Sequence, residues 1–188
     1  MSARSDFAAL QARAEACTSC RLAETRTNVV FGAGDPSAQL MFIGEGPGEQ
    51  EDLHGVPFVG RAGKLLTQLI EEIGLSRETV YIANVVKCRP PANRDPALDE
   101  IEACRGFLAS QLEMIEPRVV VTLGNFATKW LLNTKVGITK LRGVATEVDG
   151  ITVVPMLHPS AVLRHGGGLP LAQTRADFVT VKRLLADQ

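Results

Sequence analysis

No stretch of this sequence approaches the roughly 18 uninterrupted apolar residues that a membrane-spanning helix needs. Residues Met1 to Phe7 also lack the basic-then-apolar layout of a signal peptide. We therefore expect a cytoplasmic protein with no membrane partner. The chain also lacks an excess of charge of either sign. Its formal net charge of −1 excludes a protein that coats nucleic acid by bulk electrostatics. A nucleic-acid partner would have to meet a local basic face.

The two common nucleotide-binding motifs are absent. The segment Gly44–Gly48 reads GEGPG, which breaks the G-x-G-x-x-G spacing, and Gly60–Leu65 reads GRAGKL, which lacks the gap and the hydroxyl of a P-loop. The loop after Gly44 is also acidic and would repel a phosphate, through Glu45, Glu49, Glu51 and Asp52. Phosphate is therefore the wrong ligand for the first half of this loop.

Two basic residues, Arg61 and Lys64, lie at the start of an expected helix, where the helix dipole disfavours positive side chains. They are either solvated surface charges or, together with backbone amides, ligands for a phosphate of a larger polyanion.

The chain has only four cysteines, and a reducing cytoplasm would keep them from forming disulfides. Cys17 and Cys20 form a C-x2-C pair, and Cys88 and Cys104 a C-x15-C pair. By ligand type alone, four thiolates suit zinc or an iron–sulfur cluster about equally well. Four ordinary buried thiols are the third possibility.

Short apolar segments alternate with segments of helical periodicity, which predicts an α/β protein with a mostly parallel sheet. The length of 188 residues fits a single domain over 1–188. An Asp149-Gly150 pair predicts a hairpin turn between two late strands. The expected strands span residues 39–43, 79–86, 118–123, 144–148 and 151–157, and the expected helices 7–16, 65–73, 125–132 and 171–186.

Three loops should meet at one edge of this sheet, because ligands of open α/β sheets bind beyond the carboxyl ends of the strands. They are Gly44–Asp52, Lys87–Arg94 and His158–Arg164. We expect them to share one site.

Four segments and the cysteine spacing together resemble one family. The segments are Gly44–Asp52 (GEGPGEQED), Gly55–Gly60 (GVPFVG), Asn84–Pro91 (NVVKCRPP) and His158–Arg164 (HPSAVLR). In this order and at these intervals they resemble the family 4 uracil-DNA glycosylases, the iron–sulfur branch of the uracil-DNA glycosylase superfamily. The resemblance covers nearly the whole chain from Cys17 onward.

The resemblance implies a three-layer α/β/α sandwich around a central, mostly parallel sheet. It also implies a [4Fe-4S] cluster on Cys17, Cys20, Cys88 and Cys104. The implied activity is the removal of uracil from single- or double-stranded DNA by a monomer, in base excision repair.

Site roles follow from the same resemblance, because a base inside a duplex must be flipped into a pocket before it is cut out. Phe58 would stack on uracil, and the Asn84 amide would donate to O4 and accept from N3–H, a pattern that cytosine reverses. Glu45 would stabilise the positively charged sugar and position water, and His158 would donate to O2. Each of these three side chains, Phe58, Asn84 and His158, has an ordinary structural role as its alternative.

Glu51 is similar to a family residue near uracil C5, and it is also a candidate for the water-activating role. Gly46 matches a position where other branches carry a catalytic aspartate. For DNA contact the resemblance and the loop positions point to Arg61, Lys64, Arg89 and Arg164, with Arg94, Lys140 and Arg142 as further candidates. Leu163 would wedge into the vacated base stack.

Three other functions compete with this one. A related branch captures uracil-DNA covalently through a histidine in an extra loop after Cys-Arg-Pro-Pro, but here the only histidines are His54, His158 and His165. A second possibility is an iron–sulfur protein that recognises damaged DNA without turnover. A nucleotide hydrolase or a redox protein is the third.

Overall fold

The computed structural model describes residues 3–187, with side chains from Asp6 onward. Over these residues a six-stranded sheet runs in the order β1-β3-β2-β4-β6-β5. The four central strands are parallel, and each edge strand is antiparallel to its neighbour. The strands are β1 (Ala33–Gly34), β2 (Leu40–Gly44), β3 (Tyr81–Asn84), β4 (Val119–Leu123), β5 (Thr146–Val148) and β6 (Ile151–Met156).

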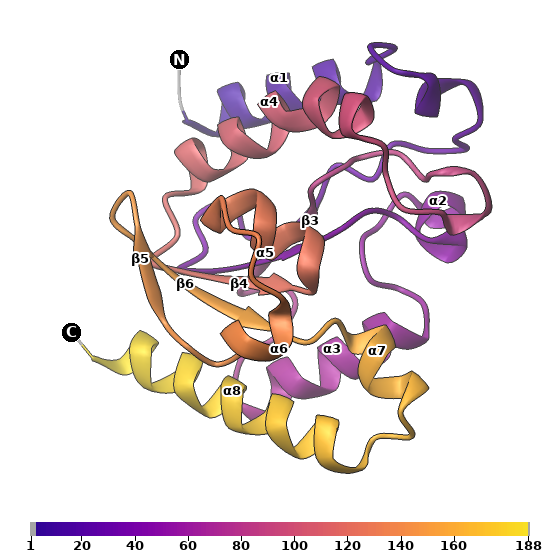
Figure 1. Cartoon of the computed structure of the whole chain (residues 1–188). Helices are drawn as coiled ribbons and strands as arrows, with labels where there is room; N and C mark the ends of the chain where they lie inside the picture. Colours follow the sequence, from indigo (N-terminus) through magenta and orange to yellow (C-terminus); the bar gives the residue numbers. More distant parts are fainter. Residues whose placement is uncertain (1–2, 188) are drawn as a thin grey trace.

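Helices cover both faces of the sheet, as Figure 1 shows. They are α1 (Ala3–Glu15), α2 (Glu49–His54), α3 (Arg61–Glu72), α4 (Leu98–Ile115), α5 (Asn125–Leu132), α6 (Ile138–Leu141), α7 (Pro159–Arg164) and α8 (Gly168–Ala186), with short 3-10 turns at Arg21–Glu24 and Pro91–Asn93.

Along each strand, successive side chains point to opposite faces of the sheet. In β2, Leu40 and Phe42 pack with α3, α7 and α8, whereas Met41 and Ile43 pack on the opposite side with α4 and α5. Because every β2 residue is buried, the strand reads as one continuous apolar run. These two cores confirm the three-layer α/β/α sandwich.

The strand order reverses at β2, because β3 pairs with one edge of β2 and β4 pairs with the other. Such a switch point opens a crevice beyond the carboxyl ends of the strands. The loops after β2, β3, β4 and β6 all start at that edge, so the fold brings together segments that are more than a hundred residues apart.

Most predicted elements are confirmed with shifts of one or two residues at their ends, and the helix at 125–132 matches in full. The hairpin is confirmed too, with Asp149 and Gly150 at φ 48° and 82°. The helices expected at 7–16, 65–73 and 171–186 begin three or four residues earlier than predicted. The short α2, α6 and α7 escaped prediction because one turn or two carries too little periodicity. The strand β1 and the long helix α4 were not predicted either. Among the described residues no helix is long and apolar enough to cross a membrane. Of the segment Met1 to Phe7, Met1 and Ser2 lie outside the described residues.

Candidate active site

A cleft of about 570 Å³ lies at the edge where the four parallel strands end. Its walls come from the loop after β2, the end of β3, the loop before α4, the start of α5 and the start of α7. The cleft therefore unites the three segments that the sequence placed at one site. All the residues predicted for catalysis and uracil binding line it: Glu45, Gly46, Glu51, Phe58, Asn84 and His158. Two predicted DNA-contact residues, Arg94 and Arg164, line it as well.

Asn84 is the most unusual of these residues. Its side chain is 1% exposed, yet neither its amide nitrogen nor its carbonyl oxygen has a hydrogen-bond partner within the described structure. A buried polar group left unpaired is costly, so an unpaired amide that lines a cleft indicates a ligand. Position 44 beside Asn84 requires glycine, because a Cβ there would collide with the Asn84 oxygen and the Phe58 ring.

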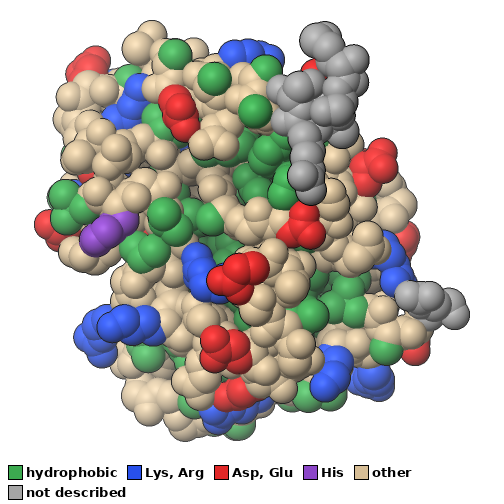
Figure 2. Space-filling model, turned by 180° about the vertical axis from the view of Figure 1, so that it is seen from behind, with side chains coloured by type: hydrophobic (Ala, Val, Ile, Leu, Met, Phe, Trp, Pro, Cys, Tyr) green, Lys and Arg blue, Asp and Glu red, His purple; other side chains and the backbone are tan. Residues whose placement is uncertain are grey.

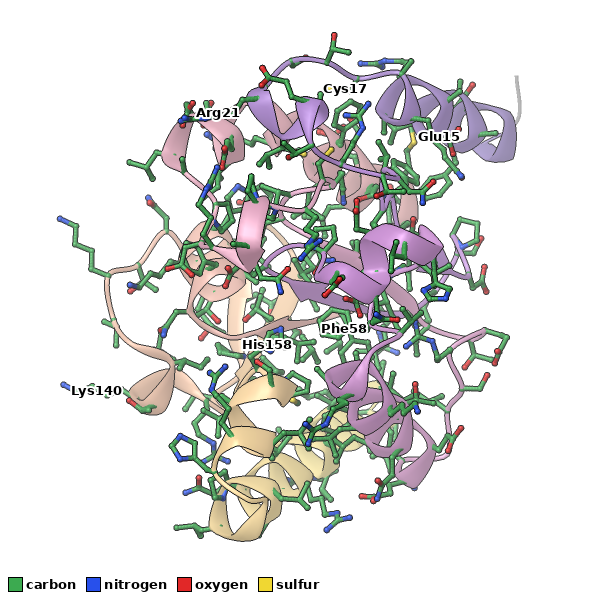
Figure 3. The ribbon with its side chains drawn as sticks, turned by 90° about the vertical axis from the view of Figure 1, so that its right-hand side faces the viewer. Glu15, Cys17, Arg21, Phe58, Lys140 and His158 are labelled. Atoms are coloured by element: carbon green, nitrogen blue, oxygen red, sulfur yellow. The ribbon has the colours of Figure 1, made fainter. Side chains whose placement is uncertain are left out.

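Phe58 is held in a left-handed backbone conformation, at φ 54°, which a bulky residue adopts only when its surroundings force it. Arg77 supplies that force by donating to the carbonyls of Pro57 at 2.6 Å and of Phe58 at 3.0 Å. The Phe58 ring lies 5.6 Å from the His158 ring, centroid to centroid, at an angle of 33°. Figure 3 shows these two side chains next to each other in the middle of the molecule.

Glu51 holds the same loop from inside the cleft. One carboxylate oxygen accepts from the backbone N–H groups of Val59 (2.9 Å) and Gly60 (3.0 Å), and the other from that of Gly48 (3.1 Å). The side chain thus joins the start of α2 to the start of α3. This engagement favours a positioning role for Glu51 over activation of water, although both remain predictions.

Glu45 follows β2 directly and lies half-buried in the cleft. Burial, together with the nearby carboxylate of Asp95, raises the pKa of its carboxyl to about 7. The ionised form is therefore the minor one at acidic pH and the major one above neutrality. A carboxylate with a pKa so close to 7 is typical of catalytic groups.

His158 caps the N-terminus of α7. Its Nδ1 accepts from the backbone N–H of Ser160 at 3.2 Å and lies 2.8 Å from the Ser160 hydroxyl. Because Nδ1 acts as an acceptor, the ring proton of the neutral form sits on Nε2. Burial lowers the pKa of His158 to about 4, helped by the positive charge of Arg164, so the imidazole is neutral at physiological pH.

A second, smaller hollow is lined by all four cysteines, Cys17, Cys20, Cys88 and Cys104. The pKa of Cys104 is raised to about 11, chiefly by burial; Lys87 opposes this rise, and the neighbouring Cys88 and Cys20 add to it. The pKa of Cys88 is raised as well, chiefly by burial. The four thiols are therefore close enough to oppose one another's ionisation.

Two cations border the cysteines. Arg26 donates to the Cys17 carbonyl at 2.7 Å and to the Cys88 sulfur at 3.3 Å. The Lys87 backbone N–H donates to the Cys104 sulfur at 3.3 Å, while its buried ammonium contacts the Asn84 carbonyl at 2.9 Å. Positive charge and N–H donors around sulfur favour an anionic metal–thiolate centre.

This donor set fits a metal centre with four thiolate ligands, since four cysteines border one hollow and cationic and N–H groups lie beside their sulfurs. A zinc ion and an iron–sulfur cluster both use such ligands.

The predicted DNA-contact residues divide into two groups. Arg61, Lys64 and Arg164 are exposed, and within residues 3–187 no side-chain partner is present for them; Lys140 likewise extends outward from α6 in Figure 3. Arg89 donates through Nε to Asn93 at 2.7 Å, which leaves its terminal nitrogens available. Figure 2 shows basic and acidic side chains interspersed over the far face, in keeping with the balanced net charge.

Three further candidates are already engaged by the protein itself. Arg94 binds Glu100 through both terminal nitrogens, and Arg142 binds Asp177 at 2.6 Å. These contacts argue against phosphate binding by either arginine. Leu163 is half-buried and packs on the core, so its role as a wedge stays a prediction.

Sequence reasoning missed Arg77 and Asp95. Arg77 acts on a loop nineteen and twenty residues before it, and Asp95 approaches Glu45 across the cleft. Neither residue belongs to a motif, and no local pattern could have marked them.

A sequence profile described as the uracil DNA glycosylase superfamily matches residues 31–185. The chain belongs to the uracil-DNA glycosylase superfamily. It is 52% identical over 155 residues to a type-4 uracil-DNA glycosylase of Thermotoga maritima, covering 81% of each chain. It is 48% identical over 182 residues to a type-4 uracil-DNA glycosylase of Saccharolobus solfataricus, covering 92% of this chain and 83% of that one.

A type-5 uracil-DNA glycosylase of Pyrobaculum aerophilum is more distant within the superfamily, at 30% identity over 171 residues, covering 82% of this chain and 74% of that one. Similarity to the type-4 enzymes at 40% to 52% identity therefore confirms the predicted branch.

Glu45→Gln should stabilise this superfamily member at alkaline pH. The folded pKa of about 7 exceeds the ordinary value of 4.5, so folding holds the proton more tightly, and wild-type stability falls as pH rises from 4.5 through 7. The full shift corresponds to about 3 kcal/mol, which partial exposure reduces to about 1 kcal/mol. Urea unfolding should show Glu45→Gln more stable than wild type at pH 8 and equal at pH 4, with the exposed Glu49→Gln unchanged at both. Equal stability of wild type and Glu45→Gln at pH 8 would contradict the raised pKa.

Proposed function

We propose that the protein is a uracil-DNA glycosylase, a monofunctional hydrolase that flips uracil out of DNA and leaves an abasic site. The observation that carries the proposal is the unpaired, buried amide of Asn84 at the floor of the cleft. Type-4 uracil-DNA glycosylases at about half sequence identity support it independently.

Uracil supplies the two partners that Asn84 lacks. The amide N–H of Asn84 donates to O4 of the base, and the amide oxygen accepts from N3–H. Cytosine offers a donor at C4 and an acceptor at N3, so it would leave both atoms of the amide opposed to like groups. Phe58 forms the stacking surface for the ring, and its fixed backbone keeps that surface in place before the base arrives.

Cleavage of the glycosidic bond places positive charge on the sugar and negative charge on the base. Ionised Glu45 stabilises the sugar cation and orients a water molecule toward C1′. The neutral His158 donates its Nε2–H to O2 of the departing base. Because the imidazole stays neutral, it stabilises the developing anion by a hydrogen bond and does not have to give up its proton.

Two helices add to this field. The N-termini of α3 and α5, the positive ends of their helix dipoles, reach the cleft through Ala62 and Asn125. Glu51 and Arg77 act as positioning residues, because they fix the loop that carries Phe58. Gly46 leaves room for the base where a side chain would meet Val86.

Arg61, Lys64, Arg89 and Arg164 are assigned to the DNA backbone, since the first two and Arg164 are exposed, Arg89 is partly exposed with its terminal nitrogens unengaged, and Arg164 lines the cleft. Cys17, Cys20, Cys88 and Cys104 would hold a [4Fe-4S] cluster, which when bound supplies cross-links between the N-terminal segment and the core. We further propose that the chain acts as one domain and as a monomer on single- or double-stranded DNA. The cytoplasmic location stays a prediction.

Uracil excision is the direct test. Protein incubated with a uracil-containing oligonucleotide and then with alkali should cut the strand at uracil, at a rate that rises with pH through about 7 as Glu45 ionises. Glu45→Gln should lower kcat by about 10²- to 10³-fold and remove this rise, while Glu49→Gln should match wild type. Tight binding of the oligonucleotide without any cut would instead identify a protein that recognises uracil without turnover.

The substitution Asn84→Asp tests whether the Asn84 amide recognises the base. An ionised aspartate has no donor for O4, so excision of uracil should fall by about 10²-fold or more. Single-turnover rates on uracil and cytosine oligonucleotides provide the measurement. Unchanged rate and selectivity would remove Asn84 from the base contact.

Iron analysis tests the cysteine site. Purified protein should be brown and contain about four irons per chain, and Cys104→Ser should lose much of that iron. A colourless, zinc-loaded and fully active preparation would refute the cluster.

A further inference from the structure

One wall of the cleft is a loop whose conformation is held from outside. This cleft-wall loop, residues 89–97, contributes Pro90, Asn93, Arg94 and Asp95 to the cleft lining. Ala92 and Asn93 both adopt left-handed φ values, 54° and 53°; asparagine tolerates this conformation, whereas alanine adopts it only under constraint. Something must therefore fix the loop.

Glu100 supplies that constraint. Its side chain is 0% exposed, and its carboxylate binds both terminal nitrogens of Arg94, at 2.6 and 2.8 Å. One oxygen also accepts from the Ala97 N–H at 2.8 Å, closing the N-terminus of α4. Arg94 in turn donates to the Asp95 carbonyl at 2.9 Å, so the side-chain contact fixes the backbone next to the cleft.

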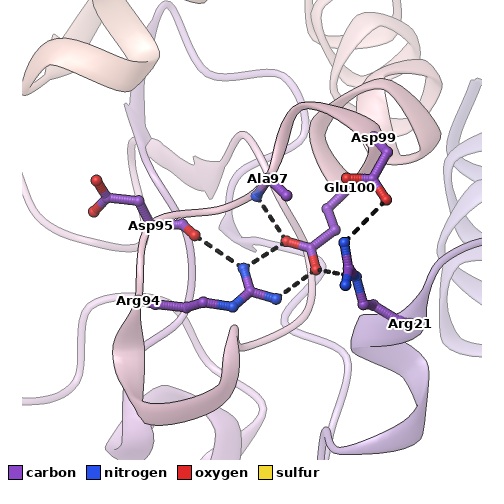
Figure 4. Close-up of polar contacts among 6 residues, drawn as sticks. All are labelled: Arg21, Arg94, Asp95, Ala97, Asp99 and Glu100. Atoms are coloured by element: carbon purple, nitrogen blue, oxygen red, sulfur yellow. Dashed lines mark hydrogen bonds and ion pairs between the residues drawn. The ribbon is translucent and has the colours of Figure 1, made fainter.

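The same carboxylate reaches the cysteine-bearing segment. Arg21, which directly follows Cys20, places its Nε 3.3 Å from Glu100, and its Nη2 lies 3.4 Å from Asp99. Figure 4 shows Glu100 between the two arginines, one from each segment. A buried carboxylate that accepts from four donors, three on two arginines and one backbone N–H, is fully satisfied and rigid, whereas an amide in its place would turn an NH2 group toward some of these donors.

We infer that Glu100 is a positioning residue that fastens the cleft-wall loop to the segment carrying Cys17 and Cys20. The consequence of this fastening for catalysis rests on the proposed function: with the loop held, Asp95 keeps a fixed position relative to Glu45. The segment carrying Cys17 and Cys20 and the wall of the base pocket thereby share one ion-pair network, centred on the buried Glu100.

Limited trypsin digestion of the purified, iron-containing protein tests the fastening without any substrate. Trypsin needs the Arg94 side chain extended and free, and it does not cut Arg89, which precedes a proline. Glu100→Gln should accelerate the cut after Arg94 by about tenfold or more, followed by mass spectrometry. Lys87 is 1% exposed, so a cut after it reports global unfolding and should stay slow.

Matched variants separate the two arms of the network. Glu102→Gln, on the exposed side of the same helix, should digest like wild type. Arg21→Gln removes one donor from the carboxylate and should accelerate the Arg94 cut by about threefold. Wild-type protection of Arg94 in Glu100→Gln overturns the inference, and wild-type protection in Arg21→Gln overturns the link to the cysteine segment.

Kinetics then test the positioning role. Glu100→Gln should lower kcat at saturating uracil-DNA by about tenfold while KM stays within about twofold, because the misplaced wall acts on the reacting sugar and not on the DNA backbone. An accelerated Arg94 cut with unchanged kcat would overturn the catalytic role. If wild-type protein fails to excise uracil, the proposed function is rejected, and the digestion still decides whether Glu100 fastens the loop.

Discussion

An amide that is fully buried with both of its polar atoms unpaired is the constraint on which the rest of the cleft depends. Asn84 ends a parallel strand. The fold tolerates the free-energy cost of its unpaired amide because the surrounding sheet is apolar and tightly packed. The neighbouring features serve the same purpose. Gly44 leaves space for the amide, and Phe58 covers it from one side. A ligand with the complementary pair of hydrogen-bonding groups relieves the cost, and this explains selectivity without any charged contact to the base.

In the proposed mechanism, Glu45 and His158 act on opposite sides of the bond to be cut. Burial raises the pKa of Glu45 and lowers that of His158, since in each case desolvation penalises the charged form. The result is a carboxylate that ionises near neutrality and an imidazole that stays neutral. Both groups sit at strand ends, so their separation is set by the sheet and not by flexible loops.

Irregular segments of the cleft are fastened by buried or half-buried charges. Glu51 and Arg77 hold the loop of Phe58 from opposite sides, and Glu100 holds the loop of Asp95. A further contact joins the cysteine-bearing side to α2, where the buried Asp52 accepts from the Thr27 N–H at 2.9 Å. Charged hydrogen bonds to backbone groups stabilise conformations that local propensity disfavours. The cysteine hollow and the cleft are therefore parts of one connected structure.

The sequence by itself determined the α/β class, most strands and helices, and the three loops that meet at the cleft with Glu45, Asn84 and His158 in its lining. It did so because burial patterns, turn residues and motif spacing are local signals. Only the tertiary structure decided that Asn84 lacks partners, that Asp95 faces Glu45, and that Arg77, Glu51 and Glu100 hold the loops. These facts arise from contacts between residues far apart in the chain, whose energies depend on burial and geometry that no local pattern records.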